Sequence, residues 1–472
     1  MPGRMEFEFQ FRGSKRPPSF GSEARMRILL MGDFSARGSR GFGEPELGRR
    51  PLLRIDAETF DAVLAQLAPR LRIPGATAEA TPLVLDFAAL DDFHPDQLAP
   101  KLEAQPGFQF PPALVSADRE PAPSAVGGGG VGKETRPTAA ATGEEDTMAR
   151  LLGGGLPPAA PGGADISALL KHVVAPHITP AVDPRLPRQA AAAQQTAGQR
   201  LRDLLHEPGF QRLEAAWRAV HRLVHSVESE DVTVSLLDVS RQELAVDLAA
   251  GPDGCALHRR LGDAHPAWSL LIADEFFGPA ADDVAQLAAL GAIASQTGAP
   301  LIAGADPQID WAALSETDAA RWQSLRHSPA AGWIGLALPR WLLRLPYGPK
   351  TNPVESFPFD EFAATRPHEA YLWGNPAYAC ALLAAAAFRD RGADMALGDV
   401  VEIDRLPCHT YREEGEARMQ PCAEVFLSER LGTTLLGRGL IPLASSRDRN
   451  AIRVLRFQSI ADPPAALAGP WK

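Results

Sequence analysis

Residues 333–362 read WIGLALPRWLLRLPYGPKTNPVESFPFDEF, and residues 371–375 follow as YLWGN. The apolar run at 334–338 ends at Pro339, which is typical of a short buried strand that cannot continue within a sheet. Several prolines and a glycine come next, and these residue types predict a rigid, irregular excursion of the backbone. We call the whole stretch 333–375 the elbow.

Two arginines of the elbow are four positions apart, so one turn of helix would place both guanidinium groups on one face. The elbow could be a catalytic loop in which Arg340, Arg344 and Lys350 bind an anion. It could instead be architectural, with arginines that pair with carboxylates inside a domain or across an interface. Because the sequence supplies no nucleophile with a partnered base, we predict the architectural role. The structural or interface residues assigned to it are Arg340, Trp341, Arg344, Tyr347, Lys350, Trp373 and Asn375.

The chain has 472 residues with 47 basic and 58 acidic side chains, which give a formal net charge of −11. A general nucleic-acid binder should show a basic excess or a basic stripe, so nucleic acid is not an expected partner. No charge-free apolar run reaches the roughly 18 residues of a membrane span, so no membrane insertion is expected. The N-terminus also lacks the apolar core of a secretory signal, and we predict a cytoplasmic protein.

The cysteines do not indicate a metal centre. Four cysteines in a chain of this length do not form a disulfide framework. Cys408 and Cys422 are the nearest pair, with one neighbouring histidine, His409. This spacing matches no known zinc motif, so we predict free thiols, no metal and no cofactor.

The first part of the chain has the pattern of a small α/β unit. Residues 1–23 are polar and predict a flexible arm, whereas residues 24–104 contain apolar segments. RMRILLMGD at 25–33 and TPLVLDF at 81–87 predict strands. IDAETFDAVLAQL at 55–67 predicts an amphipathic helix. The glycines between these elements fit neither phosphate-binding fingerprint, so we predict a mobile loop there.

A change of composition separates this unit from the rest. Residues 105–164 are rich in Gly, Pro and Ala and predict a flexible, disordered linker. For residues 165–200 we predict a docking helix, Asp165–Ile178, followed by an extended segment.

Residues 201–472 predict a second α/β unit. Apolar runs at 231–239, 268–273 and 299–303 alternate with amphipathic helices, which indicates a largely parallel sheet. Ser240 and Glu243 have the spacing of a capping box at the start of one helix.

Acidic residues follow two of these predicted strands, where open α/β sheets bind ligands. They are Asp274, Glu275 and Asp306. A paired-carboxylate hydrolase is conceivable, but no partner acid, base or metal set converges on these residues, so we predict no catalysis. The alternative is an enzyme on an anionic substrate, with Arg340 and Arg344 as the clamp and Asp274 or Glu275 as the acid or base.

The first unit resembles the small subunit of the contractile sheath in bacterial type VI secretion systems. The phrases LLMGDFSAR, RRPLLRIDAETFDAVLAQLAPRL and LDFAALDDFHPDQL carry this resemblance within about residues 24–103. The second unit resembles the large subunit of the same sheath over about residues 165–460. The phrases FQRLEAAWRAVHRLV, VSLLDVSRQELAVDL, LPRWLLRLPYGPKTNPVESFPF and YLWGN carry it. We expect the large subunit's C-terminal extension to be lacking.

The resemblance implies two sheath-type α/β units, with mixed α and β elements, fused through a Gly/Pro/Ala-rich linker. It implies a structural protomer that acts through protein–protein interfaces. The expected partners are sheath, tube or baseplate proteins, in a homo-oligomer or in co-assembly with sheath subunits. A second interpretation is a sheath-related accessory, baseplate or cap protein that does not polymerise.

Overall fold

The structure is a computed structural model that describes residues 25–41, 47–75, 81–104, 185–227, 229–362, 367–413, 415–446 and 449–471. The N-terminal arm, the linker at 105–164 and the docking helix at Asp165–Ile178 lie outside the described residues. The described part of the segment predicted to be extended is helical instead. Helix α6 (Arg185–Leu205) begins there, and its run of alanines favours a helix.

The chain divides into two compact units. Residues 1–110 and 195–472 make up the first unit, and residues 111–194 make up the second. In the second unit the described part is residues 185–194, the beginning of α6. The segment with small-subunit resemblance and the segment with large-subunit resemblance therefore fold together in one unit.

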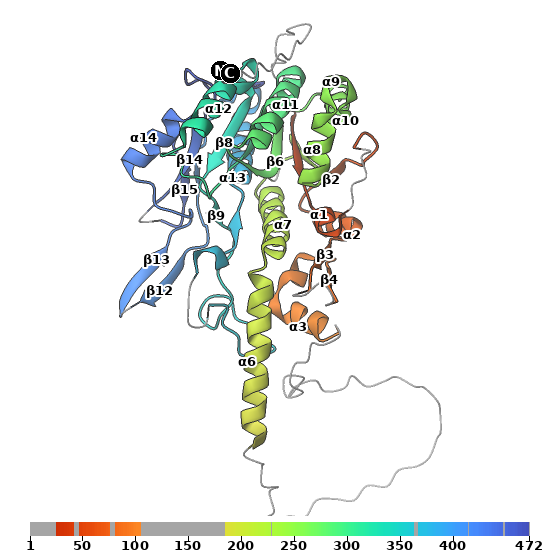
Figure 1. The fold of residues 1–472 in the computed structure, drawn as a ribbon, viewed down its shortest axis with the longest axis vertical. Coiled ribbons are helices and arrows are strands. Elements are labelled where there is room, and N and C mark those ends of the chain that lie inside the picture. Colours follow the sequence, from red (N-terminus) through yellow and green to blue (C-terminus); the bar gives the residue numbers. More distant parts are fainter. Residues whose placement is uncertain are drawn as a thin grey trace, which may run out of the picture. The chain divides into compact units, whose positions relative to one another are not determined.

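A nine-stranded sheet, counted over the described residues, is the centre of the first unit (Figure 1). Five neighbouring pairs in its middle are parallel, as the strand and helix alternation predicts, and the strands at both ends are antiparallel. In spatial order the strands are β11 (Glu402–Ile403), β15 (Ile452–Val454), β14 (Leu440–Ser445), β8 (Ile334–Leu338), β7 (Leu301–Ala305), β6 (Leu270–Phe277), β1 (Met26–Gly32), β5 (Val232–Asp238) and β2 (Leu53–Ile55).

Strand β1 lies inside this sheet although it comes from the first segment of the chain. It pairs with β5 from Met26↔Val232 to Gly32↔Asp238, and with β6 on its other side. Six of its seven residues are buried. The near-continuous apolar sequence of β1 is what a parallel strand covered on both faces requires.

Three two-stranded sheets and a set of helices complete the described fold. The small sheets pair β3 (Arg70–Ile73) with β4 (Leu83–Asp86), β9 (Trp341–Leu342) with β10 (Trp373–Gly374), and β12 (His409–Glu413) with β13 (Glu416–Gln420). The α-helices besides α6 are α1 (Arg37–Arg40), α2 (Phe60–Leu67), α3 (Pro95–Glu103), α7 (Pro208–Ser226), α8 (Arg241–Ala249), α9 (Gly251–Gly254), α10 (Ala256–Gly262), α11 (Ala281–Thr297), α12 (Glu316–Arg326), α13 (Pro376–Arg391) and α14 (Glu429–Gly437). The 3₁₀ turns are η1 (Leu90–Phe93), η4 (Pro329–Trp333), η5 (His368–Ala370) and η6 (Gly392–Asp394).

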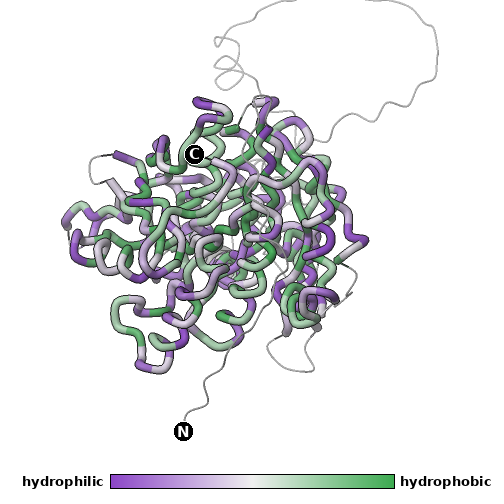
Figure 2. The backbone as a smooth tube through the Cα atoms, turned by 90° about the horizontal axis from the view of Figure 1, so that it is seen from above, coloured by the Kyte–Doolittle hydropathy of each residue, from purple (hydrophilic) through white to green (hydrophobic). Residues whose placement is uncertain are grey.

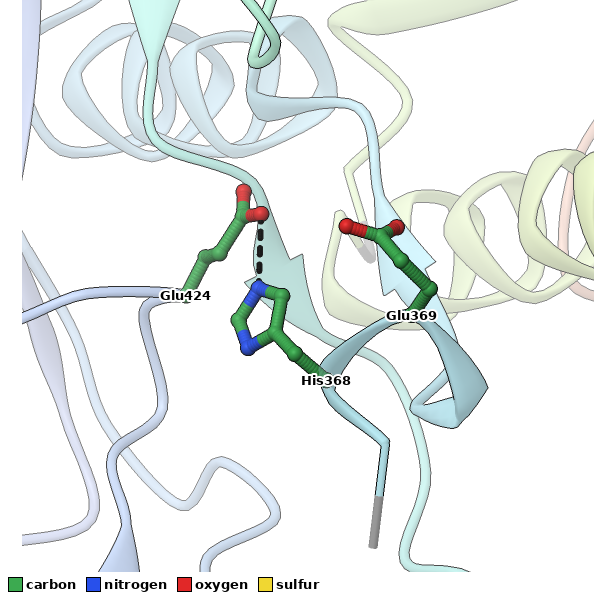
Figure 3. A group of neighbouring side chains, drawn as sticks. All are labelled: His368, Glu369 and Glu424. Atoms are coloured by element: carbon green, nitrogen blue, oxygen red, sulfur yellow. Dashed lines mark hydrogen bonds and ion pairs between the residues drawn. The ribbon is translucent and has the colours of Figure 1, made fainter.

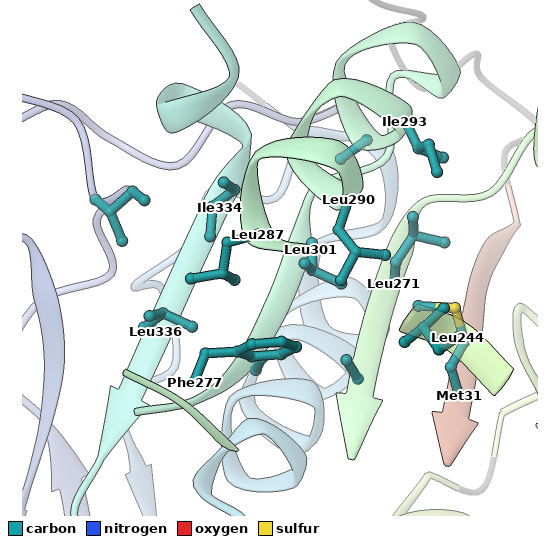
Figure 4. Close-up of a cluster of buried hydrophobic side chains, with 14 of the residues drawn as sticks. Met31, Leu244, Leu271, Phe277, Leu287, Leu290, Ile293, Leu301, Ile334 and Leu336 are labelled. Carbon is teal, nitrogen blue, oxygen red and sulfur yellow. The ribbon is translucent and has the colours of Figure 1, made fainter. Parts of the chain in front are cut away.

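Helices cover both faces of the large sheet. Helix α11 packs on β6, β7 and β8 and contacts α8, α10 and α12, whereas α13 packs on the other face beside α7 (Figure 1). The layer under α11 is a continuous apolar core (Figure 4), which includes Met31, Leu271, Leu301 and Leu336. Hydrophobic stretches run through the interior of the described backbone, and hydrophilic stretches gather at its periphery (Figure 2). Burial of this apolar surface is the main force that holds the layers together.

The structure shortens one predicted element. Residues 55–67 divide into the end of β2 and helix α2, which begins at Phe60. The side chain of Asp56 accepts hydrogen bonds from the amide and hydroxyl of Thr59, so these residues form a turn before the helix. The capping box at Ser240 and Glu243 is present as predicted.

Replacing Leu30 tests whether the two segments unfold as one body. Leu30 is completely buried in β1, so Leu30→Ala should lower the free energy of unfolding by about 2–5 kcal/mol. All eight tryptophans lie in residues 217–471, outside the first segment. Urea unfolding followed by tryptophan fluorescence should therefore report the loss if unfolding is cooperative.

Val246→Ala is the matched control, because Val246 is 59% exposed on α8, and it should change the stability by less than about 0.5 kcal/mol. A tryptophan transition that Leu30→Ala leaves unmoved would mean that the second segment folds independently of β1.

Candidate functional site

The elbow runs through the structure as a short strand pair and not as a helical turn. Trp341 and Leu342 form β9, and the amide of Leu342 donates to the carbonyl of Cys422 at 2.8 Å. The carbonyl of Arg340 accepts from the amide of Glu424 at 2.8 Å. The turn of helix that would place both guanidinium groups on one face does not form, because the backbone of this stretch pairs with residues far away in the sequence.

Arg344 lies at the centre of a buried ion-pair network. Its guanidinium contacts Glu214 of α7 at 2.8 Å and Glu361 at 2.8 Å. The exposed fractions of the three residues are 7%, 0% and 1%. Glu214 also pairs with Arg218, one helical turn further along α7, at 2.7 Å. Arg344 and the two glutamates are thus buried together, with the half-buried Arg218 at the edge of the network, and this pairing offsets the cost of removing the charges from water.

Tyr347 closes this network. Its amide donates to Glu361 at 2.7 Å, its hydroxyl accepts from Arg218 at 3.1 Å, and its ring lies 4.2 Å from the Arg344 guanidinium carbon. Burial alone would lower the pKa of Arg344, but Glu214 and Glu361 outweigh it and raise the pKa well above its usual value. Burial raises the pKa of Tyr347 to about 12. Arg344 and Tyr347 therefore each keep one charge state throughout the physiological pH range.

Arg340 forms a second, more exposed group. Its guanidinium donates to Glu424 at 2.6 and 2.9 Å and to Glu369 at 3.1 Å. His368 Nε2 lies 2.9 Å from Glu424 (Figure 3). Burial would raise the pKa of Glu424, but the hydrogen bonds and charges of Arg340 and His368 lower it to about 2.

Three of these side chains have the spacing of a possible metal site within the described residues. His368, Glu369 and Glu424 place one ligand atom each within 4.8 Å of one another. Arg340 already supplies a positive charge to both carboxylates, so the group has its counter-charge without a metal. Sequence reasoning missed this group because Glu424 is distant along the chain and no spacing motif joins it to His368.

The other residues assigned to the elbow have separate positions. Trp341 is buried, and its indole NH donates to the carbonyl of Asn375 at 3.1 Å. The Asn375 side chain caps α13 by accepting from the amide of Ala377 at 3.0 Å. Trp373 is buried in β10, whereas Lys350 is exposed. Their expected role as interface or structural residues stays a prediction.

A third polar cluster joins the two segments at the carboxyl ends of β1 and β5. We call it the segment joint, and it comprises Ser35, Arg37, Arg50, Asp238 and Glu243. Asp238 accepts from the amide and hydroxyl of Ser35 at 2.9 and 2.7 Å. Two guanidinium nitrogens of Arg50 donate hydrogen bonds to the Glu243 carboxylate at 2.8 and 3.0 Å. Burial would raise the pKa of Glu243, but Arg50, Ser240 and Arg37 lower it to about 2.

The acids predicted at strand ends do not share one site. Asp274 and Glu275 lie inside β6, and Asp306 follows β7 in a turn where its carboxylate accepts from the amide of Gln308. Glu275 pairs with Arg241 at 3.1 Å. Burial raises the pKa of Asp274 to about 7, and the neighbouring Glu275 adds to the rise. Arg340 and Arg344 bind other carboxylates, so the structure does not bring together the four residues of the alternative enzyme.

The described residues contain no helix long and apolar enough to cross a membrane. The geometry so far defines a class of protein: an α/β protein in which buried charges tie its own segments together. Comparison with known families then identifies the class more closely.

The family model for the EvpB/VC_A0108 tail sheath N-terminal domain (VipB) matches residues 188–461, which is more than half of the chain. The model for the type VI secretion system protein VipA, VC_A0107 or Hcp2 matches residues 20–105. The chain therefore belongs to the type VI secretion tail sheath family, and both resemblances seen in the sequence are confirmed.

A curated relative supports the same assignment. The type VI secretion system sheath protein TssC1 of Pseudomonas aeruginosa is 30% identical over 289 residues, which are 55% of this chain and 58% of the relative. The chain thus spans a little over half the length of that relative. The family is a structural component of the sheath.

Replacing Arg344 should destabilise the fold, because two buried carboxylates then lose the guanidinium group that they share. We expect Arg344→Met to lower the free energy of unfolding by about 3–5 kcal/mol. Adding Glu361→Gln should recover part of the loss, because one uncompensated charge is then removed. Chemical denaturation of the single and double variants measures both effects.

Arg389→Met is the control, because the Arg389–Asp390 pair is 46% and 52% exposed, and it should cost less than about 0.5 kcal/mol. If Arg344→Met costs no more than this control, the buried network does not stabilise the fold.

Asp274 should make stability fall as pH rises. Its folded-state pKa is about 7 and its ordinary value is 3.8. The folded state therefore holds the proton more tightly, so the contribution of Asp274 is full below pH 4 and is lost between pH 4 and 7. Asp274→Asn cannot titrate. We expect its stability relative to the unmodified protein to increase by about 4 kcal/mol over this window.

Urea titrations of both proteins at several pH values give this difference, in which the titration of all other groups cancels. A difference that does not vary with pH would contradict the raised pKa.

Proposed function

We propose that the chain is a single-chain protomer of a type VI secretion contractile sheath. In this proposal the segment resembling the small subunit and the segment resembling the large subunit act as one body. The body works through protein–protein interfaces and not through a catalytic site. The cytoplasmic location expected from the sequence stays a prediction.

The observation that supports a single body most strongly is the position of β1. The strand has a hydrogen-bonded neighbour on each side, and both neighbours belong to the other segment. Removing β1 would leave two unpaired strand edges in the middle of a buried sheet, where unsatisfied backbone groups are costly. Mechanical load on either segment is therefore transmitted directly to the other.

Side-chain contacts reinforce the same connection. The indole NH of Trp217 in α7 donates to the carbonyl of Phe34 at 2.9 Å, and the rings of Phe34 and Phe60 pack edge-on against it. Arg260 donates to the carbonyls of Leu47 and Gly48 at 2.9 and 3.1 Å. Together with the segment joint, these contacts bind the two segments to each other directly. The covalent connection between the segments then only favours an association that has its own contacts. Such a tether turns a two-chain association into an intramolecular one.

The elbow residues divide into two groups under this proposal. Arg344, Trp341, Tyr347, Trp373 and Asn375 are buried and hold the elbow to α7 and α13, so we assign them structural roles. Arg340 is half-buried and paired with Glu369 and Glu424, and we place it in the same group. Lys350 is exposed, so it is the member of the set that is free to face a partner. The partners we propose are further copies of the chain or other sheath subunits, together with tube or baseplate proteins. Head-to-tail contacts that do not close into a ring would generate a helical array.

Electron microscopy of the purified chain tests the proposal. We expect tubules or helical rows, alone or after mixing with sheath subunits and the inner tube protein from the same host. A second sample carries a protease site between Gly128 and Gly129. After cleavage the two pieces should still co-elute and form the same assemblies, because the shared sheet and not the peptide connection holds them together.

The outcomes separate the interpretations. A monomer or small closed ring under every condition would favour the accessory, baseplate or cap protein over the sheath protomer. Pieces that separate after cleavage would contradict the single body and leave a tethered pair.

A further inference from the structure

Cys408 and Cys422 lie at the base of the β12–β13 hairpin, one on each of its strands' connections to the rest of the unit. The hairpin begins with the pair His409↔Gln420. Cys408 immediately precedes this pair on one strand, and Cys422 follows it two residues later on the other. The hairpin therefore brings both thiols to the same end, where its strands join the rest of the unit.

The hairpin places the two thiols close enough for each to influence the pKa of the other. The Cys408 thiol in turn lies 3.7 Å from the carbonyl oxygen of Gln420, to which it donates. Both cysteines are free in the structure. The two side chains are therefore neighbours at the base of the hairpin.

The backbone around both residues is held by independent contacts. On one side, the carbonyl of Cys422 accepts from Leu342 at 2.8 Å, and the amide of Ala423 donates to Ser445 at 2.6 Å. On the other, the buried ring of His409 and the hydroxyl of Tyr371 share a hydrogen bond of 2.8 Å. The two cysteines are thus presented to each other by a preorganised frame.

We propose that Cys408 and Cys422 form a reversible disulfide that clamps the base of the β12–β13 hairpin. The co-reactant is a small-molecule disulfide such as oxidised glutathione. One cysteine thiolate attacks a sulfur of the oxidant, forms a mixed disulfide and releases one reduced thiol. The second cysteine thiolate then attacks the mixed disulfide, closes the intramolecular bond and releases the second thiol. The protein loses two electrons and two protons, and the oxidant gains them.

The surroundings of the two sulfurs set the order of the steps. Cys408 is half-buried, whereas Cys422 is 2% exposed, so the oxidant reaches Cys408 first and Cys422 resolves the mixed disulfide. Burial raises the pKa of both thiols, that of Cys422 to about 12. Because the thiolate is the nucleophile, closure should be slow near neutral pH and faster as pH rises. The bond would then respond to sustained oxidation and not to brief exposure.

Oxidation of the folded full-length chain with oxidised glutathione, followed by intact-mass and peptide analysis, tests the proposal. The unmodified chain should become lighter by two hydrogens and yield a peptide pair joined through Cys408 and Cys422. The reaction should be about tenfold faster at one pH unit higher. Reduced glutathione in excess should reverse it.

Two single variants separate the steps. Cys422→Ser should stop at a stable glutathione adduct on Cys408, because the resolving thiol is absent. Cys408→Ser should remain unmodified, because Cys422 is enclosed. Cys255 and Cys380, which are buried, are internal controls and should stay reduced in every folded sample. Matching circular dichroism spectra show that both variants fold.

Three results would overturn the proposal. One is a persistent glutathione adduct on Cys408 in the unmodified chain, and another is a disulfide between two chains. The third is a chain that stays fully reduced at every pH at which it is folded.

Discussion

The hydrogen bonding of β1 on both sides is the constraint on which the rest of the structure depends. An interior strand of a parallel sheet must satisfy its backbone groups through neighbours and bury side chains on both faces. Here the neighbours β5 and β6 come from the second segment, and the helices α11 and α13 cover the two faces. Neither segment contains all the strands of the nine-stranded sheet by itself. The two regions that match different family models are therefore interdependent parts of one fold.

Enclosed ion pairs have a second role, which is to fix positions. The Arg344 network connects the elbow to α7, and the segment joint connects the end of β1 to the start of α8. A buried ion pair contributes little net stability compared with a well-packed apolar substitute, but losing one partner is severe. Its directional hydrogen bonds therefore act mainly as locks on geometry. Such locks suit a protein that must keep its shape while its surface meets partners.

The polar groups that the sequence offered as chemical candidates serve mostly as such locks. Arg340 and Arg344 bind carboxylates of their own chain, and Glu275 binds Arg241. The anion clamp of the alternative enzyme would require guanidinium groups directed toward a shared opening. In the described residues these groups are directed toward separate internal partners instead. This arrangement agrees with membership of a structural sheath family.

The sequence alone determined the family, the largely parallel α/β class and most of the element types, because each depends on local patterns. Apolar runs bounded by prolines gave the strands, and the spacing of Ser240 and Glu243 gave a helix cap. The tertiary structure decided which strands pair and which distant side chains meet, because local sequence patterns hold no information about either. Strand pairing fixed the elbow as β9 and not a helical turn, and the insertion of β1 merged two apparent units. It also brought Glu424 to His368 and Cys408 to Cys422. Such contacts join residues far apart in the chain, and their energies depend on packing that no local window records.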